Sequence, residues 1–294
     1  MYKIMVLFLI AFTSMGAFGE PNMGISGTVG WDTMQINAEI SLDLASAGLR
    51  LPSGRTQGES LLNAGFLNLI LPSILSLQVD SSSTIADLVD RGEITMQEIE
   101  AIALMANAVP PALSPDMRNI SAYHSIPLKN ITSSLLRHSR PSPIMRTLNP
   151  VSAARFTGIL IIAAENLPVH GMRSTALPVP SLFPKIWDSE MNLIFERNML
   201  EPGRSAMVHY SSLQNIFVNN PSGLSPELQE VVGERPLRIF AQGVFGIKPT
   251  DLIIDKNDAL LIISSEENRR LLSQGKVAII LDDSVLRYEF NGEL

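Results

Sequence analysis

The chain has 294 residues, of which 46% are apolar and 17% carry a charge, so it can form one large domain or two small domains with hydrophobic cores. Its net charge of −7 is spread thinly, and the chain therefore lacks the basic surface that phosphate backbones require. We expect no nucleic-acid partner. Cysteine is absent, which excludes disulfides, thiolate catalysis, cysteine-ligated zinc and a lipid-modified N-terminal cysteine.

The first residues have the pattern of a secretory signal peptide. Lys3 precedes the apolar run Ile4–Phe12, and Ala17 and Gly19 are small residues placed for cleavage before Glu20. The run is too short to cross a bilayer, which takes about 20 helical residues. We therefore predict that residues 1–19 are removed and that the mature chain is exported to the periplasm or to the periphery of the outer membrane. No later segment is long and charge-free enough for us to expect a transmembrane span.

The mature chain is expected to begin with a flexible lead-in and a long strand. Residues 20–30 are rich in glycine and small side chains, which predicts the lead-in. From Met34 to Leu44, apolar residues alternate with polar ones, the period of a strand with one buried face. We expect Ile36, Ile40 and Leu42 to face the core.

Helices follow this strand and complete an N-terminal α+β module over residues 31–136. Ser60–Val79 is apolar on most faces and predicts a buried helix, which Pro72 should kink or end. Thr95 and Glu98 have the spacing of a capping box, which predicts a helix start there. The remaining elements expected in this module are a short helix before Gly92, a strand over Asn119–Leu128 and a short helix over Ile131–Leu136.

A proline-rich segment, residues 137–152, predicts a linker to a β-rich C-terminal module over residues 153–294. Ser264 and Glu267 repeat the capping-box spacing, and Gly275 stands where a helix C-terminus favours glycine. We predict an α+β fold of two small modules, each a mostly antiparallel sheet packed with helices. The strands expected here are Phe156–Ala163, Leu182–Trp187, Asn192–Glu196, Ala206–Tyr210, Leu237–Val244, Asp251–Asp255 and Lys276–Asp282, with helices at Asn257–Ile263 and Glu266–Leu272.

The usual signatures of catalysis are missing from the sequence. There is no GxSxG elbow, no GxxxxGK[ST] loop and no HExxH helix, and the four histidines are far apart in the chain. Asp251, Asp255 and Asp258 resemble half of a calcium loop, although helix capping explains Asp255 equally simply. We therefore predict no catalytic, cofactor-binding or metal-binding residues.

The segment "SLFPKIWDSEMNLIFE" predicts an apolar β-hairpin around a polar turn that holds Asp188 and Glu190. Ile186 and Trp187 fall on opposite faces, so one of them must contact something other than the core of this module. The inserted segment Val169–Val179 or a neighbouring subunit could cover that face. Two interpretations are open for the apolar side chains: ordinary core, or an assembly surface. The candidate interaction surface consists of Phe183, Ile186, Trp187, Leu193 and Phe195.

Several of these segments together resemble a family of exported bacterial proteins. "TGILIIAAENLP", the hairpin, "RPLRIFAQGVFGIKPTDLIIDKNDALLII" and "GKVAIILD" are similar in order and spacing to a domain of the FlgT/FlgP-type flagellar envelope proteins. "LQVDSSSTIADLVDRGEI" and "AYHSIPLKNITSSLL" resemble the N-terminal α+β module of the same proteins. The resemblance covers residues 31–136 and 156–282. Departures include Ala163-Ala164 in place of an aspartate and the insertion Val169–Val179.

The resemblance implies a non-enzymatic envelope component of the flagellar basal body, acting as a ring or scaffold piece. Its expected partners are further copies of itself or flagellar and outer-membrane proteins. The family supplies no catalytic residues to carry over to this chain. Two alternatives remain open at this point, namely an exported hydrolase with its site between the modules and a periplasmic carrier of a small ligand.

Overall fold

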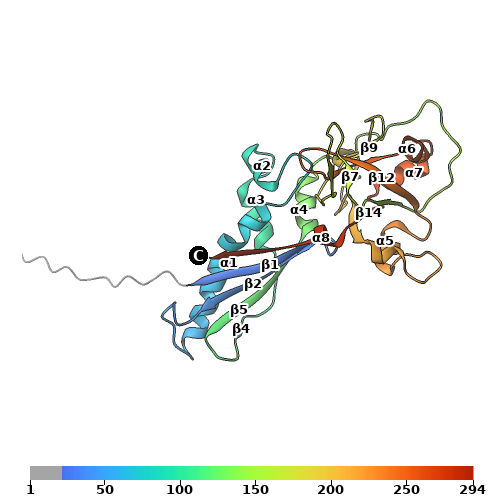
Figure 1. Ribbon diagram of the computed structural model, residues 1–294. Coiled ribbons are helices and arrows are strands. Elements are labelled where there is room, and N and C mark those ends of the chain that lie inside the picture. Colours follow the sequence, from blue (N-terminus) through green and yellow to red (C-terminus); the bar gives the residue numbers. More distant parts are fainter. Residues whose placement is uncertain (1–21, 294) are drawn as a thin grey trace, which may run out of the picture.

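The computed structural model describes residues 22–293, which form two domains arranged end to end (Figure 1). The predicted signal peptide lies outside the described residues. Helices and strands are both abundant and the two domains are separate in space, so the predicted α+β class is confirmed. The predicted linker, residues 137–152, contains no helix or strand.

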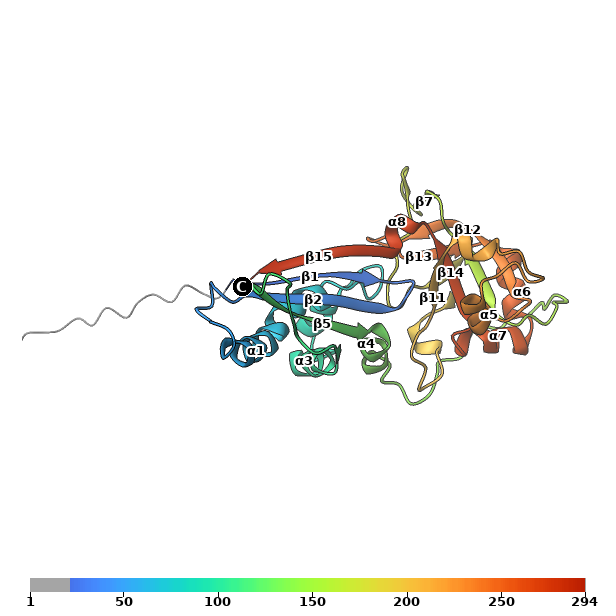
Figure 2. The same cartoon turned by 90° about the horizontal axis from the view of Figure 1, so that it is seen from below.

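The first domain is an antiparallel sheet with helices packed on one of its faces (Figure 2). The strands lie in the order β15-β1-β2-β5-β3, and β4 also pairs with β5. The strands are β1 (Met23–Gly30), β2 (Gln35–Asp43), β3 (Asn107–Ala108), β4 (Ala112–Leu113), β5 (Asn119–Pro127) and β15 (Arg287–Glu293). The helices are α1 (Gly54–Leu75), α2 (Ile85–Asp90), α3 (Met96–Leu104) and α4 (Leu128–Leu135).

Strand β2 confirms the alternation predicted for Met34–Leu44. Ile36, Ile40 and Leu42 are fully buried, and Ile40 lies opposite Ile25 of β1 and Ala122 of β5. The polar residues between them face the side of the sheet that carries no helices. The predicted core face and register of this strand are therefore correct.

Helix starts in this domain follow the predicted local chemistry. The backbone N of Glu98 donates to Thr95 Oγ1 at 3.3 Å, and the backbone N of Thr95 donates to Glu98 Oε2 at 2.8 Å, which confirms the capping box of α3. Helix α1 contains Pro72 and ends three residues later, at Leu75. This helix is long and apolar enough to cross a membrane by length and composition alone, but its buried face packs on the sheet.

Two of the predicted domain boundaries are wrong. Residues 20–30 are not a flexible lead-in, because Met23–Gly30 is β1, a central strand of the sheet. The predicted C-terminal module does not keep the chain to its end either, since β15 returns to the first domain and pairs with β1. The close approach of these two strands explains one glycine of β1: a Cβ at Gly27 would stand 2.4 Å from the Phe290 ring.

The second domain is built on a seven-stranded sheet in the order β10-β9-β13-β12-β6-β14-β11. Four of its six strand pairings are parallel, so the prediction of a mostly antiparallel sheet is wrong for this domain. The strands are β6 (Ile159–Ile162), β9 (Ile186–Asp188), β10 (Leu193–Phe195), β11 (His209–Ser212), β12 (Leu237–Phe245), β13 (Asp251–Ile254) and β14 (Val277–Leu281).

The sequences of the central strands fit a sheet that is covered on both faces. All residues of β13 and β14 are buried, because the helices of this domain lie on both faces of its sheet. Strands buried on both faces lose the polar alternation seen in β2. The helices are α5 (Pro226–Val232), α6 (Lys256–Ile263), α7 (Glu266–Ser273) and α8 (Asp283–Leu286), with single 3₁₀ turns at Arg197–Met199 and Leu213–Ile216.

Two local features of this domain differ from or refine the prediction. The N-cap of α7 is Ser265, whose Oγ accepts from the backbone N of Asn268, whereas Ser264 Oγ accepts from the backbone N of Val151. The predicted capping box at Ser264 and Glu267 is therefore wrong, because the N-cap lies one residue later and is a single hydrogen bond from the backbone to Ser265. The insertion Val169–Val179 is part of a small separate hairpin, β7 (Leu167–Pro168) paired with β8 (Thr175–Ala176).

Candidate functional site: the junction between the domains

The residues predicted as an interaction surface lie inside the second domain, next to the first. Phe183, Ile186 and Phe195 are buried, with relative exposures of 3% or less. Trp187 and Leu193 are half-buried and lie opposite each other in the predicted hairpin of β9 and β10. Three of the five side chains are therefore core and cannot form a surface that another subunit reaches.

A loop of the first domain, Gln78–Ser83, is bonded directly into the second domain. The backbone N of Leu182 donates to Gln78 O at 3.0 Å, and the backbone N of Phe183 donates to Val79 O at 2.8 Å. Farther along the loop, the backbone N of Lys248 donates to Ser81 O at 2.9 Å. The loop thus continues the backbone hydrogen bonding of the second domain across the domain boundary.

Gly246 makes room for this loop. Its φ of +108° lies in the region that only glycine adopts readily, and a Cβ there would stand 2.2 Å from Ser81 Cβ. The backbone turn after β12 and the loop of the first domain therefore fit together only without a side chain at this position.

The carboxylate of Asp251 is the polar centre of the junction. It lies at the start of β13, is 1% exposed, and accepts hydrogen bonds from both domains. Ser81 Oγ donates at 3.1 Å from the first domain, and the backbone N of Lys185 donates at 3.1 Å from the second. Trp187 Nε1 donates at 3.4 Å and Thr250 Oγ1 at 3.2 Å. Burial raises the pKa of the Asp251 carboxyl, and these hydrogen bonds lower it again in part.

A second set of contacts crosses the boundary on the Trp31 side. The Trp31 ring meets the Tyr210 ring edge to face, with centroids 5.9 Å apart. The Tyr210 hydroxyl donates to Ser181 O at 2.8 Å and accepts from Ser181 N, and burial raises its pKa. The hydroxyl of Thr132 on α4 donates to the carbonyl of Ser205. Aromatic packing and buried hydrogen bonds therefore hold the domains together at two separate places.

Charged side chains close the rim of the junction. Arg197 places its guanidinium over the Phe183 ring, 5.5 Å from the centroid, and pairs with Glu93 of the first domain at 3.7 Å. Arg137 pairs with Glu98 of α3 at 2.8 Å. The Arg197–Glu93 pair crosses the domain boundary, whereas the Arg137–Glu98 pair joins the start of the linker to the first domain.

Two family models match the chain over these same two domains. The model of the N-terminal domain of Treponema pallidum Tp0624 matches residues 22–134, and the model of the second domain of that protein matches residues 158–283. The chain carries both domains, in this order. No curated protein matches the chain. The family descriptions name no activity and no flagellar protein, so the FlgT/FlgP-type resemblance stays a prediction.

The acidic residues singled out in the Tp0624-type second domain do not converge on one site. Asp251 is at the junction, whereas Asp255 caps α6 by accepting from the backbone N of Asn257 at 2.7 Å. Asp188 holds the turn of the hairpin, where it accepts from the backbone N and Nδ2 of Asn192, each at 2.8 Å. Within residues 22–293, no three His, Cys, Asp or Glu side chains are placed to hold a metal ion.

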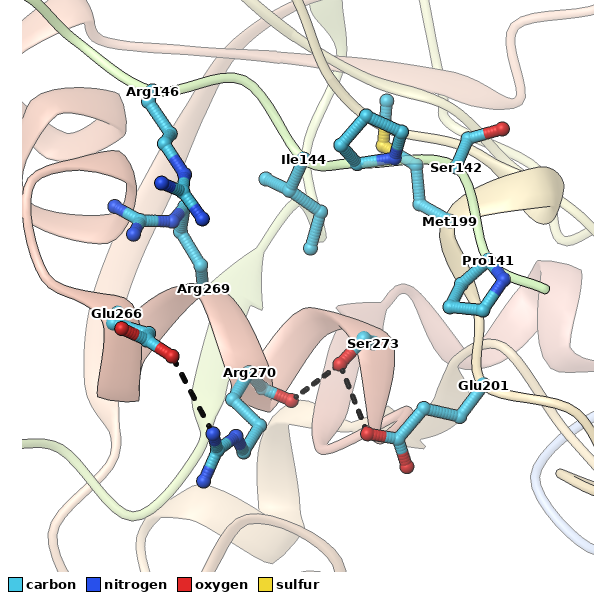
Figure 3. A pocket seen from close by; sticks show the side chains of 11 residues that line it. Pro141, Ser142, Ile144, Arg146, Met199, Glu201, Glu266, Arg269, Arg270 and Ser273 are labelled. Carbon is cyan, nitrogen blue, oxygen red and sulfur yellow. Dashed lines mark hydrogen bonds and ion pairs between the residues drawn. The ribbon is translucent and has the colours of Figure 1, made fainter.

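Open hollows lie near the junction. One, of about 230 Å³, is at its rim and is lined by Glu93, Arg137 and Arg197. Another, of about 490 Å³, is lined mainly by apolar surface, including Trp31, Pro180 and Tyr288. A further hollow, of about 210 Å³, lies between the linker and α7 (Figure 3). Charged side chains line it, and three of them already have partners: Arg270 pairs with Glu266 at 3.5 Å, and Glu201 accepts from Ser273 Oγ at 3.3 Å.

Only part of this site has a signal in the sequence. In the sequence, Asp251 stands out only together with Asp255 and Asp258, as half of a calcium loop. Its position at the start of a run of buried strand residues, "DLII", was the signal that its carboxylate would be enclosed. Ser81 had no signal at all, because its contact with Asp251 joins residues 170 positions apart in the chain.

Proposed function

We propose that the protein is a non-enzymatic structural component of the bacterial cell envelope. In this proposal it is exported to the periplasm or the outer-membrane periphery and serves as a ring or scaffold piece associated with the flagellar basal body. The flagellar assignment is supported by the sequence resemblance of residues 31–136 and 156–282. The structural assignment is supported by the junction described above.

The junction is the observation that carries the proposal. A scaffold must hold a fixed spacing between its contact surfaces, and this chain fixes its two domains by backbone hydrogen bonds through Gln78–Ser83, by the buried Asp251 and by the return of β15. Domains joined only through a flexible linker are expected to move relative to each other. A hydrolase site between the domains would need groups that are free to meet a substrate, and the Asp251 carboxylate already accepts four hydrogen bonds.

Cell fractionation tests the location, and gene deletion tests the role. In a bacterium that carries this gene, we expect the protein in the envelope fraction with Glu20 as its first residue, because the leader has signal-peptide proportions. We expect it to co-purify with basal bodies, and its deletion to impair motility. A cytosolic pool that retains Met1 would contradict export, and normal motility with no co-purification would contradict the flagellar role.

Complementation separates a scaffold from an enzyme. A variant with both Asp188→Asn and Glu190→Gln removes the carboxylates of the hairpin turn, and we expect it to restore the function lost in the deletion strain if it is produced at the parental level. A variant that is folded, correctly located and inactive would show that this turn has a chemical role, and the non-enzymatic proposal would be wrong.

A further inference from the structure

The two edges of the first-domain sheet are built differently. At one edge, β3 and β4 are two residues each, and Pro110 and Pro111 lie between them. Short strands and prolines prevent a further strand from pairing, because proline has no amide hydrogen to donate. At the other edge, β15 is seven residues long and contains no proline (Figures 1 and 2). Among the described residues it pairs only with β1.

The unpaired backbone groups of β15 follow from its register with β1. The backbone N of Trp31 donates to Leu286 O at 2.9 Å, one step beyond the last pair of the ladder, Gly30 with Arg287. Groups that point to the same neighbour recur at every second residue of an antiparallel strand, so the even-numbered residues of β15 bond to β1. The N–H and C=O groups that point away from the sheet therefore belong to Arg287, Glu289, Asn291 and Glu293.

We propose that β15 pairs with β15 of a second copy of this chain, antiparallel and around a two-fold axis through Phe290. The proposal rests on the proposed function, since it names the surface by which the scaffold would join its own copies. Pairing at this edge merges the two sheets into one, with the helices of both copies on the same side. Backbone hydrogen bonding at an exposed strand edge is an established mode of association.

Among the registers that pair at least five residues of β15 with the second copy, the charges select one. An antiparallel pair places residues of the same face opposite each other, so the two-fold axis must pass through one residue. An axis through Glu289 places two copies of Glu289 opposite each other, and an axis through Asn291 places Glu289 opposite Glu293. Both registers oppose like charges, which is destabilising.

An axis through Phe290 avoids every such conflict. It places Arg287 opposite Glu293 of the second copy, and Glu289 opposite Asn291 of the second copy. Arg287 uses Nε and Nη2 to hold Asp32, so Nη1 is left to meet the incoming carboxylate. The two Phe290 rings, which are partly buried against the core of each copy, become cross-strand neighbours.

Cysteine crosslinking tests both the pairing and its register, because the natural chain contains no cysteine. Two single variants, Glu289→Cys and Asn291→Cys, are purified with tags of different mass and oxidised separately and together. Residues in a hydrogen-bonded antiparallel pair have Cα atoms about 5.5 Å apart, which a disulfide spans. We expect a disulfide between the two variants in the mixture and none above background in either variant alone.

The control for chance collisions is Ser26→Cys, an exposed position on the interior strand β1 of the same sheet. Crosslinking of Glu289→Cys with itself would indicate the register centred on Glu289 and overturn the proposal. A mixture that crosslinks no more than the Ser26→Cys control would overturn it as well.

Two further variants test the pairing by dissociation constant, measured by sedimentation equilibrium. Asn291→Pro removes an outward amide while sparing the bonds to β1, and we expect it to raise the dimer dissociation constant at least about tenfold. Asn291→Ala is its matched control and should leave the constant unchanged. Glu293→Arg, which places two arginines opposite each other, should also weaken the dimer without touching the backbone. Equal constants for the proline, arginine and parental proteins would refute the pairing.

The outcomes separate this inference from the proposed function. A protein that co-purifies with basal bodies but gives no mixed disulfide keeps its scaffold role and loses the β15 pairing. A protein that gives the mixed disulfide but is absent from the envelope keeps the β15 pairing and loses the proposed scaffold role. Loss of envelope association in Asn291→Pro, with the purified parent monomeric, would mean that a strand of another protein occupies this edge and that the self-pairing proposal is wrong.

Discussion

Removing the Asp251 carboxylate is the most direct test of the junction. Asp251→Ala leaves four donors without their acceptor. The hydroxyls of Ser81 and Thr250 can rotate to other partners, but the backbone N of Lys185 and the indole N of Trp187 are fixed in direction. Each stranded buried donor costs about 1–3 kcal/mol. Part of this cost is offset because the variant no longer buries a charge, and we expect the free energy of unfolding to fall by about 2–4 kcal/mol.

The two tryptophans of the chain make the assay convenient. Trp31 and Trp187 lie in different domains, and both contact the junction. Their fluorescence in a urea titration therefore reports the opening of the junction as well as unfolding. Asp90→Ala, at the exposed end of α2, is the matched control for losing an aspartate. If Asp251→Ala lies within about 0.5 kcal/mol of this control, a range typical of surface substitutions, the account of the junction is wrong.

The pH dependence gives a second, independent reading of the same group. Because burial raises the pKa of the Asp251 carboxyl, this group stabilises the fold most below the ordinary aspartate pKa of about 3.9. That contribution is lost as pH rises through the folded-state pKa. The stability difference between the parent and Asp251→Asn should therefore be largest in acid and shrink towards neutral pH. A difference that grows with pH would mean that the carboxylate, and not the protonated acid, is the form the fold prefers.

Three further changes test other parts of the fold. Ile40→Asp places an unpaired charge in the core of the first domain and should lower the free energy of unfolding by more than about 4 kcal/mol. The measurement is the cooperative thermal transition followed by circular dichroism, which should be lost. A melting curve like that of the parent would mean that the register of β2 is wrong. The Nε2 of His124 has no hydrogen-bond partner among the described residues, and burial lowers the pKa of this histidine. The stability of the parent should therefore fall as pH drops below about 6.5, and the stability of His124→Leu should fall less. Burial also lowers the pKa of His209, so the His124→Leu variant should still lose part of its stability in acid. Asp188→Asn turns an amide towards Asn192 Nδ2 and should cost about 1–2 kcal/mol in a thermal melt, whereas no loss would show that the turn does not depend on the carboxylate.

The parts of the fold that the sequence predicted are those with local causes. The alternation in β2 and the Thr95–Glu98 capping box each depend on residues a few positions apart, and both are confirmed. β1 has the same alternation, with Met23, Ile25 and Val29 buried, but its glycines made the segment look like a mobile lead-in. One of them, Gly27, serves the pairing with β15, because a Cβ there would meet the Phe290 ring, and no local pattern of the sequence specifies that pairing.

The hairpin shows how far local reasoning goes at the candidate site. The hairpin itself and the opposite orientation of Ile186 and Trp187 were predicted, and the structure buries Ile186 completely while leaving Trp187 half-buried. The residues that cover Trp187 come from other parts of the chain, which the local sequence does not reveal. Its ring packs edge to face against Phe245, at 5.9 Å between centroids, and His170 of the insertion meets the same Phe245 ring at 6.0 Å.

The indole N of Trp187 then reaches Asp251, the residue that also holds Ser81 of the other domain. The side chain that looked like a contact for another subunit is thus held within its own domain, and it is linked to the first domain only through the carboxylate of Asp251. An apolar face whose partner is missing from the local sequence has at least these two explanations, and only the long-range topology distinguishes them. By the same reasoning, the surface left for a second copy should be sought where backbone groups remain unpaired after the chain has folded, and in the first-domain sheet the long edge of this kind is the outer edge of β15.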